Sequence, residues 1–493
     1  MKKLLTTLLL LTILLTTVTP VFAIASQAAV SNEAEEHILN ELSRANIPNA
    51  AVAVIQGGET SYILHDSEPD TLFGIGSVTK SFTAFGILLL EDMGLLSVSD
   101  PVNQHLLWFN VRYNGAPVPH EDIKIYNLLQ HTSGFTSDER RFTSTAEELS
   151  VAEFIAEIDG IELAFYPSTE HIYGNVNYVI LGLLIEAVSG QNYDEFMTQN
   201  ILHPLGLYDT FTNVQRAYDT DRVIEGHRFG FLRPRAVQEQ FPPLIMPSGG
   251  AFSSISDMAR WIGIQLGVVE VSDQFARIVQ RSHENLHREQ NPFYDLDIVM
   301  ASGWGIMLEG NEHFDFENIK IMTTGSGLGY VTYLGFIPDS NTAIVMLSNV
   351  RKMNMPGWIF LLWDALDGEL VNAGAEPFAI MDIVFVVLAA VGILFIVLFV
   401  RRIVKLHKQV QSGERVKPTL RIRWLFVPIL PIAGLLVFYV ILPMLFEVHF
   451  SSIMLMGPAS GYMALISMWI ITVYSLFSLG AKILGWIPAR TKA

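Results

Sequence analysis

Phe73-Gly-Ile-Gly-Ser77-Val-Thr-Lys80-Ser-Phe-Thr-Ala84 is the stretch from which the fold can be argued. Two glycines precede a serine, and the apolar spacing that follows predicts a helix over residues 77–93. Lys80 comes one turn after Ser77, so its amine and the serine hydroxyl share one helical face. A serine hydroxyl needs a base to become a nucleophile, and a buried lysine with a lowered pKa can be that base. Taken alone, the Ser-x-x-Lys pattern is weak, and the alternative is a solvated lysine.

Tyr173-Gly-Asn175 adds two polar side chains just before a second predicted helix, residues 178–188. A tyrosine beside a lysine can act as a phenolate base or relay protons. An asparagine can hold both the lysine and a substrate amide. The alternative is a core tyrosine followed by a capping asparagine.

Thr323-Thr-Gly-Ser326 ends a strand-like run late in the chain. A strand edge at this place can present a backbone N–H to an oxyanion, together with the N–H of Ser77. Thr324 can donate a hydroxyl hydrogen bond, and Gly325 supplies the turn. Thr324 and Gly325 are therefore predicted to bind the substrate or the oxyanion.

The order of predicted elements indicates the fold class. Strands are predicted at 50–56 and 61–64, and further strands at 304–308, 319–323, 331–336 and 342–347. Helices dominate between them, including one over 257–266 with Ser256 as its cap. The prediction is an α/β (α+β) domain in which helices flank an antiparallel sheet built from both ends, with a helical subdomain inserted. The active site is expected in the cleft between these layers.

Long apolar segments at both ends predict export and membrane attachment. Residues 1–23 have the charged start, apolar run and small-residue end of a signal peptide; the alternative is an uncleaved anchor. Residues 378–400, 424–446 and 457–480 are each long enough to cross a bilayer. They predict an all-α three-helix membrane domain, and three such runs in succession argue against buried soluble helices.

The charge distribution orients these segments. The link over 401–423 and the tail over 481–493 are basic, so both are predicted to be cytoplasmic. Residues 24–376 would then form an extracytoplasmic catalytic domain at a bacterial cell membrane. The net charge of −18 leaves −28 for that domain once +2 for the signal and +8 for the C-terminal part are removed. Such an acidic domain argues against binding of nucleic acid or anionic lipid by long-range attraction.

The chain has no cysteine. This excludes disulfides, thiolate metal sites and a cysteine nucleophile. No pattern of metal ligands stands out, and the predicted chemistry needs no cofactor.

The motifs occur together in one order. Ser77-Val-Thr-Lys80 is followed by Leu128-Leu-Gln-His131-Thr-Ser-Gly134, Tyr173-Gly-Asn175, Pro247-Ser-Gly-Gly250, and then Gly325 and Gly329. This ordered set resembles the β-lactamase-related serine hydrolases, which include class C β-lactamases, penicillin-binding proteins, D-alanyl-D-alanine carboxypeptidases and related esterases. The resemblance covers roughly the whole of residues 24–376.

The resemblance implies a role for each matching residue. Ser77 would be the acylated nucleophile, Lys80 its base, and Tyr173 the group that assists proton transfer to the leaving group. Asn175 would orient Lys80 and the substrate amide, and the N–H groups of Ser77 and Ser326 would form the oxyanion hole. His131 belongs to a family marker, and its expected role is structural.

One position departs from the family pattern. The third motif usually begins with lysine or histidine, and Thr323 stands there in this chain. The backbone oxyanion contact needs no side chain and should survive. Recognition of a substrate carboxylate, as in β-lactams or peptides ending in D-alanine, is what this departure puts in doubt.

The predicted function is hydrolysis of an amide or ester through an acyl-enzyme at the outer face of the membrane. The expected substrate is a peptide or acyl-peptide containing a D-amino acid, from the cell wall or a secreted precursor. A catalytic domain followed by three spans also resembles the prodrug-activating peptidases of nonribosomal peptide pathways. Two alternatives stay open: a catalytically degenerate sensing domain that signals through the spans, and a transporter. The sequence leaves the oligomeric state open.

Overall fold

The computed structural model describes most of the region before residue 372. The described residues are 30–135, 150–230, 233–237, 242–284, 287–291, 296–300, 302–307, 320–327, 329–351 and 355–372, with short pieces between 383 and 412 and between 466 and 474. The predicted signal peptide lies outside them, and so do most residues of the three predicted spans. Within the described residues, no helix combines the length and hydropathy that crossing a bilayer requires. The three-helix membrane domain therefore stays a prediction.

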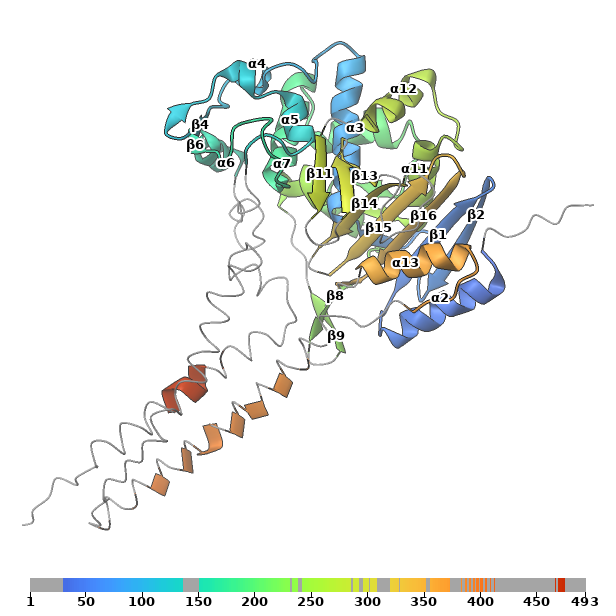
Figure 1. Ribbon diagram of the computed structural model, residues 1–493, viewed down its shortest axis with the longest axis vertical. Helices are drawn as coiled ribbons and strands as arrows, with labels where there is room; N and C mark the ends of the chain where they lie inside the picture. The colour runs from blue at the N-terminus through green and yellow to red at the C-terminus, as the bar shows by residue number, and fades with distance from the viewer. Residues whose placement is uncertain are drawn as a thin grey trace, which may run out of the picture.

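An eight-stranded antiparallel sheet forms the centre of the domain (Figure 1). In spatial order its strands are β11 (His287–Asn291), β12 (Leu296–Met300), β13 (Gly305–Met307), β14 (Lys320–Ser326), β15 (Val331–Ile337), β16 (Thr342–Ser348), β1 (Ala50–Gln56) and β2 (Glu59–His65). The strand nearest the N-terminus, β1, lies between β2 and the late strand β16, with Val52 opposite Met346. The prediction of an antiparallel sheet built from both ends of the chain is confirmed.

Helices cover both faces of this sheet, which explains why β1 is apolar at successive positions. Ala51, Ala53 and Ile55 enter the larger core cluster, and Val52 and Val54 enter the smaller one. The smaller cluster lies under α2 (Asn32–Arg44) and α13 (Met355–Leu366). The larger cluster is completed by α3 (Thr79–Asp92), α7 (Asn175–Ser189), α11 (Ile255–Leu266) and α12 (Asp273–Ser282).

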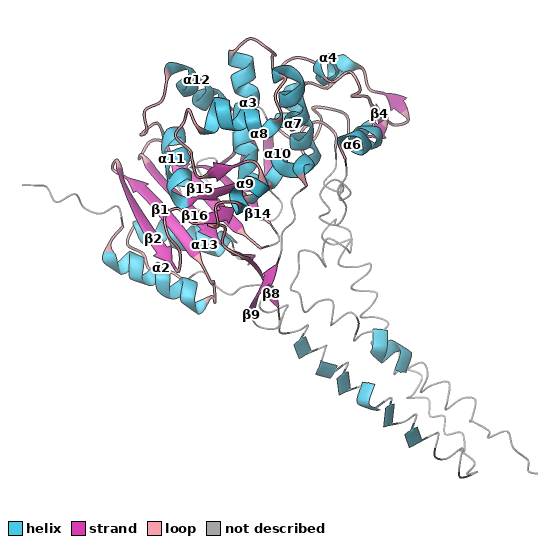
Figure 2. Cartoon of the chain, turned by 180° about the vertical axis from the view of Figure 1, so that it is seen from behind, coloured by secondary structure: helices cyan, strands magenta, loops and turns pink. Residues whose placement is uncertain are grey.

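A helical region is inserted between β2 and β11, as predicted, and Figure 2 shows it beside the sheet. Besides the four long helices it contains short ones: η1 (Gly76–Val78), α4 (Val102–His105), η2 (His120–Asp122), α5 (Ile125–Leu129), α6 (Val151–Ile158), α8 (Tyr193–Met197), η4 (Thr198–Leu202), α9 (Val214–Tyr218), η5 (Pro243–Ile245) and α10 (Met246–Gly249). Its minor sheets are β3 (Leu72–Gly74) with β10 (Phe252–Ser254) and β7 (Thr210–Phe211), and β4 (Val111–Tyr113) with β5 (Ala116–Pro117) and β6 (Ile161–Glu162). A third links β8 (Gly226–Gly230) and β9 (Arg233–Val237) to β17 (Val350–Arg351).

The starts of α11 and α3 differ from the prediction. The prediction that Ser256 caps α11 is wrong, because the Oγ of Ser254 accepts the hydrogen bond from the Asp257 N–H (3.1 Å). Ser256 instead donates to the carbonyl of Pro69 (2.7 Å). The helix predicted from Ser77 begins as the 3₁₀ turn η1 and becomes α-helical at Thr79.

The buried carboxyl group of Asp257 makes the fold sensitive to pH. Its Oδ2 accepts hydrogen bonds from the Asp209 N–H (2.7 Å) and the Thr210 hydroxyl (2.8 Å). Burial outweighs these bonds and raises the pKa of Asp257 to about 6. A raised carboxyl pKa means that the folded state favours the protonated form. The stabilisation is therefore complete below the ordinary pKa near 4 and is lost as the pH rises through about 6.

We expect Asp257→Asn to raise the free energy of unfolding by about 2 kcal/mol at pH 7 and to change it little at pH 4. The amide oxygen can still accept both hydrogen bonds but carries no charge to desolvate. Chemical unfolding followed by tryptophan fluorescence would measure this, with the exposed Asp339→Asn as the control. An equal effect of Asp257→Asn at both pH values would contradict the explanation.

Candidate active site

A glycine-dependent turn places Ser77 at the edge of the sheet. Gly76 adopts a left-handed conformation (φ +51°), and a Cβ there would lie 2.5 Å from the backbone nitrogen of Ser326. Only glycine therefore allows η1 to approach β14 this closely. The hydroxyl of Thr79 donates to the Gly76 carbonyl (2.7 Å) and fixes the turn. Ser77 is consequently half-buried and faces the edge of the sheet at the start of α3.

Lys80 lies directly beside Ser77. Its Nζ is 3.1 Å from the Ser77 Oγ, 2.7 Å from the Asn175 Oδ1 and 2.5 Å from the carbonyl oxygen of Ser248. Its side chain is buried, with only 3 % of the residue exposed. The Ser248 contact comes from the Pro247-Ser-Gly-Gly250 segment in α10, to which sequence reasoning gave no role. Every residue has a backbone carbonyl, so the sequence could point to this contact only through the Pro247-Ser-Gly-Gly250 motif.

The surroundings of Lys80 favour its neutral form. Burial lowers the pKa of Lys80 well below its ordinary value of 10.5. In the part of the chain that the structure describes, no carboxylate forms a salt bridge with this amine. A neutral amine has two N–H donors and one lone pair. Asn175 and Ser248 can accept the two donors, which leaves the lone pair for the hydroxyl proton of Ser77.

Tyr173 contacts the other side of the Ser77 hydroxyl. Its Oη lies 2.7 Å from the Ser77 Oγ and 3.4 Å from the Asn175 Oδ1. The residue is 40 % exposed, so a substrate can reach it, while its hydroxyl end is enclosed. Burial of that hydroxyl raises the pKa of Tyr173 to about 12, although the hydrogen bond to Ser77 opposes the shift. Tyr173 is therefore a neutral phenol at physiological pH, which favours proton relay over the phenolate role left open by the sequence.

His131 supports the segment that carries Tyr173. Its Nδ1 accepts the N–H of Gly174 (3.3 Å) and the side-chain amide of Asn177 (3.1 Å). Its ring lies 4.6 Å from the Tyr173 ring. Burial, with smaller contributions from His171 and Lys80, lowers the pKa of His131 well below 6.5, so its Nδ1 is available as an acceptor. These contacts support the structural role expected for His131, which is to orient Tyr173.

Asn175 begins α7 but does not cap it. The N-cap of α7 is Gly174, and the Asn175 side chain points to Lys80 instead. The alternative of a capping asparagine is therefore wrong. The helix was predicted to start at residue 178, and it starts three residues earlier, at Asn175.

The edge of β14 completes the site. β13 pairs with β14 only as far as Met322, so the following residues face η1 on that side. A Cβ on Gly325 would lie 1.9 Å from the Ile75 carbonyl and 3.2 Å from the backbone nitrogen of Ser77. Together with the close approach of Gly76 to the Ser326 nitrogen, this places the backbone nitrogens of Ser77 and Ser326 beside the same turn. The oxyanion hole formed by their N–H groups stays a prediction.

Strand alternation separates the two threonines of β14. Thr323 shares a face with Gly325, and that face is turned to η1 and Ser77. Thr324 is exposed and lies on the opposite face. The predicted hydroxyl contact of Thr324 with substrate stays a prediction.

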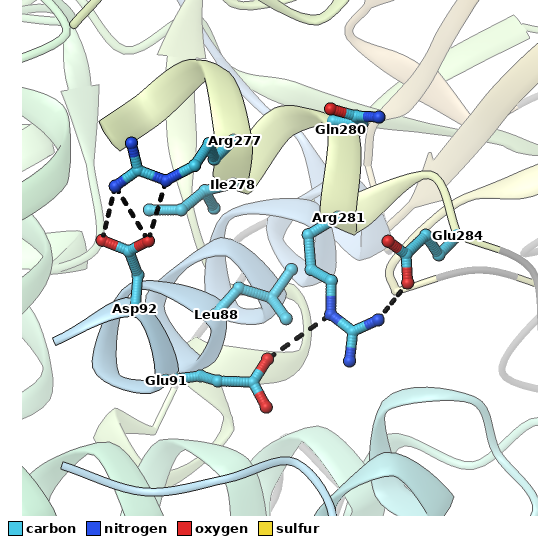
Figure 3. Close-up of a pocket in the computed structure, with 8 residues that line it drawn as sticks. All are labelled: Leu88, Glu91, Asp92, Arg277, Ile278, Gln280, Arg281 and Glu284. Carbon is cyan, nitrogen blue, oxygen red and sulfur yellow. Dashed lines mark hydrogen bonds and ion pairs between the residues drawn. The ribbon is translucent and has the colours of Figure 1, made fainter. Parts of the chain in front are cut away.

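A pocket of about 340 Å³ lies at the other end of α3, where it meets α12. Lys80 and Glu91 are about 16 Å apart along the helix axis, so this pocket is separate from Ser77. Figure 3 shows that its charged side chains pair with one another: Arg277 with Asp92 (3.2 Å), and Arg281 with Glu91 (3.5 Å).

Comparisons with known proteins agree with this geometry. A family model described as Beta-lactamase matches residues 32–362. Protein flp of Staphylococcus aureus (strain MW2) is 30 % identical over 353 residues, which are 68 % of this chain and 65 % of that protein. The alignment thus spans less than two thirds of that relative. Penicillin-binding protein 4 of Amycolatopsis lactamdurans is 28 % identical over 319 residues, or 62 % of this chain and 81 % of that protein.

Solved structures show the same fold. A class C beta-lactamase superposes with a TM-score of 0.58 at 18 % identity, covering 69 % of this chain and 96 % of that one. A class C beta-lactamase in complex with cefoxitin gives 0.58 at 19 % identity, covering 68 % and 97 %. The family match extends over more than half of the chain, and its motif residues meet at one site. This protein therefore belongs to the beta-lactamase family of serine hydrolases.

Proposed function

We propose that this protein is a membrane-anchored serine hydrolase that cleaves an amide or ester bond through an acyl-enzyme on Ser77. The observation that carries the proposal is the buried amine of Lys80, 3.1 Å from the Ser77 Oγ and held by two carbonyl oxygens. A degenerate sensing domain would have no need to retain a desolvated lysine beside a serine. The anchoring rests on the sequence of residues 378–480 and the orientation on its basic loops.

The contacts suggest a sequence of proton transfers. Lys80 takes the hydroxyl proton as the Ser77 Oγ attacks the carbonyl carbon. The N–H groups of Ser77 and Ser326 stabilise the oxyanion that forms. The phenol of Tyr173 gives its proton to the leaving group and regains one from the Lys80 ammonium. Water then attacks the acyl-enzyme, the same groups remove its proton, and the Ser77 hydroxyl is restored.

The proposed substrate is a peptide or acyl-peptide containing a D-amino acid, either a cell-wall peptide or a secreted precursor. The resemblance of the motifs and the name of the penicillin-binding relative support this class. Hydrolysis at the outer face of the membrane follows from the proposed topology.

Covalent labelling tests the proposal. The full chain would be treated with a fluorescent penicillin and, separately, with a fluorophosphonate, then analysed by intact mass and peptide mapping. We expect one adduct with the fluorophosphonate, on the peptide that contains Ser77. A folded chain that reacts with neither probe would favour the sensing alternative.

A lysine at position 323 should change which probes react. Thr323 lies on the face of β14 that is turned to Ser77, where a cation could bind a substrate carboxylate. We expect Thr323→Lys to accelerate acylation by benzylpenicillin by about 10- to 100-fold, the effect of one charge-assisted hydrogen bond. The fluorophosphonate carries no carboxylate and should react at an unchanged rate. Equal acceleration of both probes would show that the substitution acts on the nucleophile instead.

A further inference from the structure

A buried chain of two hydroxyl groups lies behind Lys80. The hydroxyl of Tyr193, on α8, is 2.6 Å from the Oγ1 of Thr83, on α3. The same Oγ1 is 2.7 Å from the carbonyl oxygen of Pro247, on α10. A carbonyl only accepts, so Thr83 donates its single hydroxyl proton to Pro247, and Tyr193 therefore donates to Thr83. Thr83 is fully buried and Tyr193 is 6 % exposed, so bulk water cannot replace these contacts.

The Pro247 carbonyl belongs to the segment that contacts the Lys80 amine. α10 is a single turn, and the last four carbonyls of a helix have no partner within it. The carbonyl of Ser248, the residue after Pro247, accepts from the Lys80 Nζ (2.5 Å). Thr83 follows Lys80 by three residues, so the two side chains share one face of α3. Successive carbonyls of α10 are thus bound by successive turns of α3.

Two further contacts restrict the movement of α10, which Figure 2 shows beside α3 and α7. A Cβ on Gly182, in α7, would lie 2.2 Å from the Pro247 Cγ, so α7 packs closely against the proline ring. The Oγ1 of Thr79, on α3, accepts the backbone N–H of Ala251 (3.2 Å), just beyond α10. Thr79 and Thr83 therefore hold this segment at both ends.

The Ser248 carbonyl affects both the protonation and the orientation of the Lys80 amine. An acceptor stabilises the ammonium form more than the neutral amine, so this carbonyl opposes the lowering of the Lys80 pKa by burial. In the neutral amine it accepts one N–H and helps to keep the lone pair directed at the Ser77 Oγ, 3.1 Å away. Movement of this carbonyl away from Lys80 would therefore lower the pKa and misdirect the lone pair.

We propose that Thr83, supported by Tyr193, is a positioning residue that holds the backbone of α10 against the Lys80 amine. Both hydroxyl groups are buried, and they act through the carbonyls of residues 247 and 248 rather than on the substrate. The inference rests on the proposed roles of Ser77 as nucleophile and Lys80 as base. It adds a second layer of residues on which the basicity of that lysine depends.

Replacing Thr83 by valine tests the proposal, because valine has a similar shape but no hydroxyl. The protonation of Lys80 would be followed in the full chain by its reactivity toward acetic anhydride across a pH series, read by peptide mapping. We expect Thr83→Val to lower the midpoint of this reactivity by about one pH unit, because the ammonium form loses an acceptor. On the high-pH plateau, the fluorophosphonate should label Ser77 about 10-fold more slowly.

Three further variants separate positioning from a general loss of packing. Thr83→Ser keeps the hydroxyl and should keep the wild-type midpoint. Thr342→Val removes the hydroxyl of another buried threonine, at the start of β16, and should change neither measurement. If Thr83→Val does not fold, as judged by near-UV circular dichroism, Tyr193→Phe must lower the midpoint, because it removes the donor to the Thr83 hydroxyl.

An unchanged midpoint in folded Thr83→Val would overturn the proposal even if labelling became slower, because a packing defect slows labelling without altering the protonation of Lys80. An equal shift in Thr83→Ser would overturn it too, since the hydroxyl would then be irrelevant. A wild-type chain that the fluorophosphonate does not label would contradict the proposed function. The reactivity of Lys80 is measured separately, so a lowered midpoint would still support the positioning role of Thr83 in that case.

Discussion

Replacing Ser77 by alanine is expected to remove covalent labelling completely and to lower hydrolysis by at least about 10⁴-fold, because no other hydroxyl can form the acyl bond. Among the described residues, the hydroxyl that is hydrogen-bonded to the Ser77 Oγ is that of Tyr173, at 2.7 Å. With a pKa of about 12, this phenol is a poor nucleophile at neutral pH. Intact mass after exposure to the fluorophosphonate and hydrolysis of a chromogenic ester would both measure the loss.

The matched control for this variant is Ser340→Ala. Ser340 is exposed in the turn between β15 and β16. It follows the end of β15, whereas Ser326 lies opposite the first residue of that strand. Ser340→Ala should label like the wild type. An adduct that persists in Ser77→Ala at the wild-type rate would mean that another residue is the nucleophile, and the proposed mechanism would have to be abandoned.

Replacing Lys80 by alanine is expected to slow acylation of Ser77 by about 10²- to 10⁴-fold, the usual contribution of a general base. The wild-type rate should rise with pH as the lysine loses its proton, and should level off well below pH 10.5 because burial lowers the pKa of Lys80. In Lys80→Ala this plateau should vanish, because the remaining slow reaction depends on hydroxide. Stopped-flow labelling across a pH series would show both effects.

Two further lysine variants sharpen this prediction. Lys80→Arg keeps a cation but cannot act as a base, so it should not restore the rate. Lys124→Ala removes a lysine whose amine lies over the Tyr126 ring, and it should leave the pH profile unchanged. A wild-type plateau that survives in Lys80→Ala would assign the titration to another group.

The polar side chains of the site could be found from the sequence because each has a chemical reason to be there. Ser77, Lys80, Tyr173 and Asn175 are up to 98 positions apart, and the structure brings them within hydrogen-bonding distance. The carbonyl of Ser248 could not be found in this way, since every residue has a carbonyl and only the tertiary path of α10 aims this one at Lys80. The same holds for the opposite faces of Thr323 and Thr324, which depend on the register of β14.

Hydrophobic patterning predicted six of the eight strands of the central sheet but not β11 and β12, and it misplaced several helix ends. Ser254 and Ser256 are both good caps, and local sequence cannot decide between them. The choice depends on Pro69, which is far away in sequence and whose carbonyl oxygen accepts the hydrogen bond from the Ser256 hydroxyl.

The place of β1 in the sheet has a consequence for how the protein is made. The backbone N–H of Asn49 donates to the Asn349 side chain, 300 residues later, and β1 pairs with β16 just beyond. Such distant pairing makes folding slow, and the central sheet cannot close until residue 348 has been synthesised. Until then β1 and β2 form a hairpin with an open, apolar edge, a template for aggregation. The growing chain is therefore expected to need a chaperone that covers this edge during most of its synthesis.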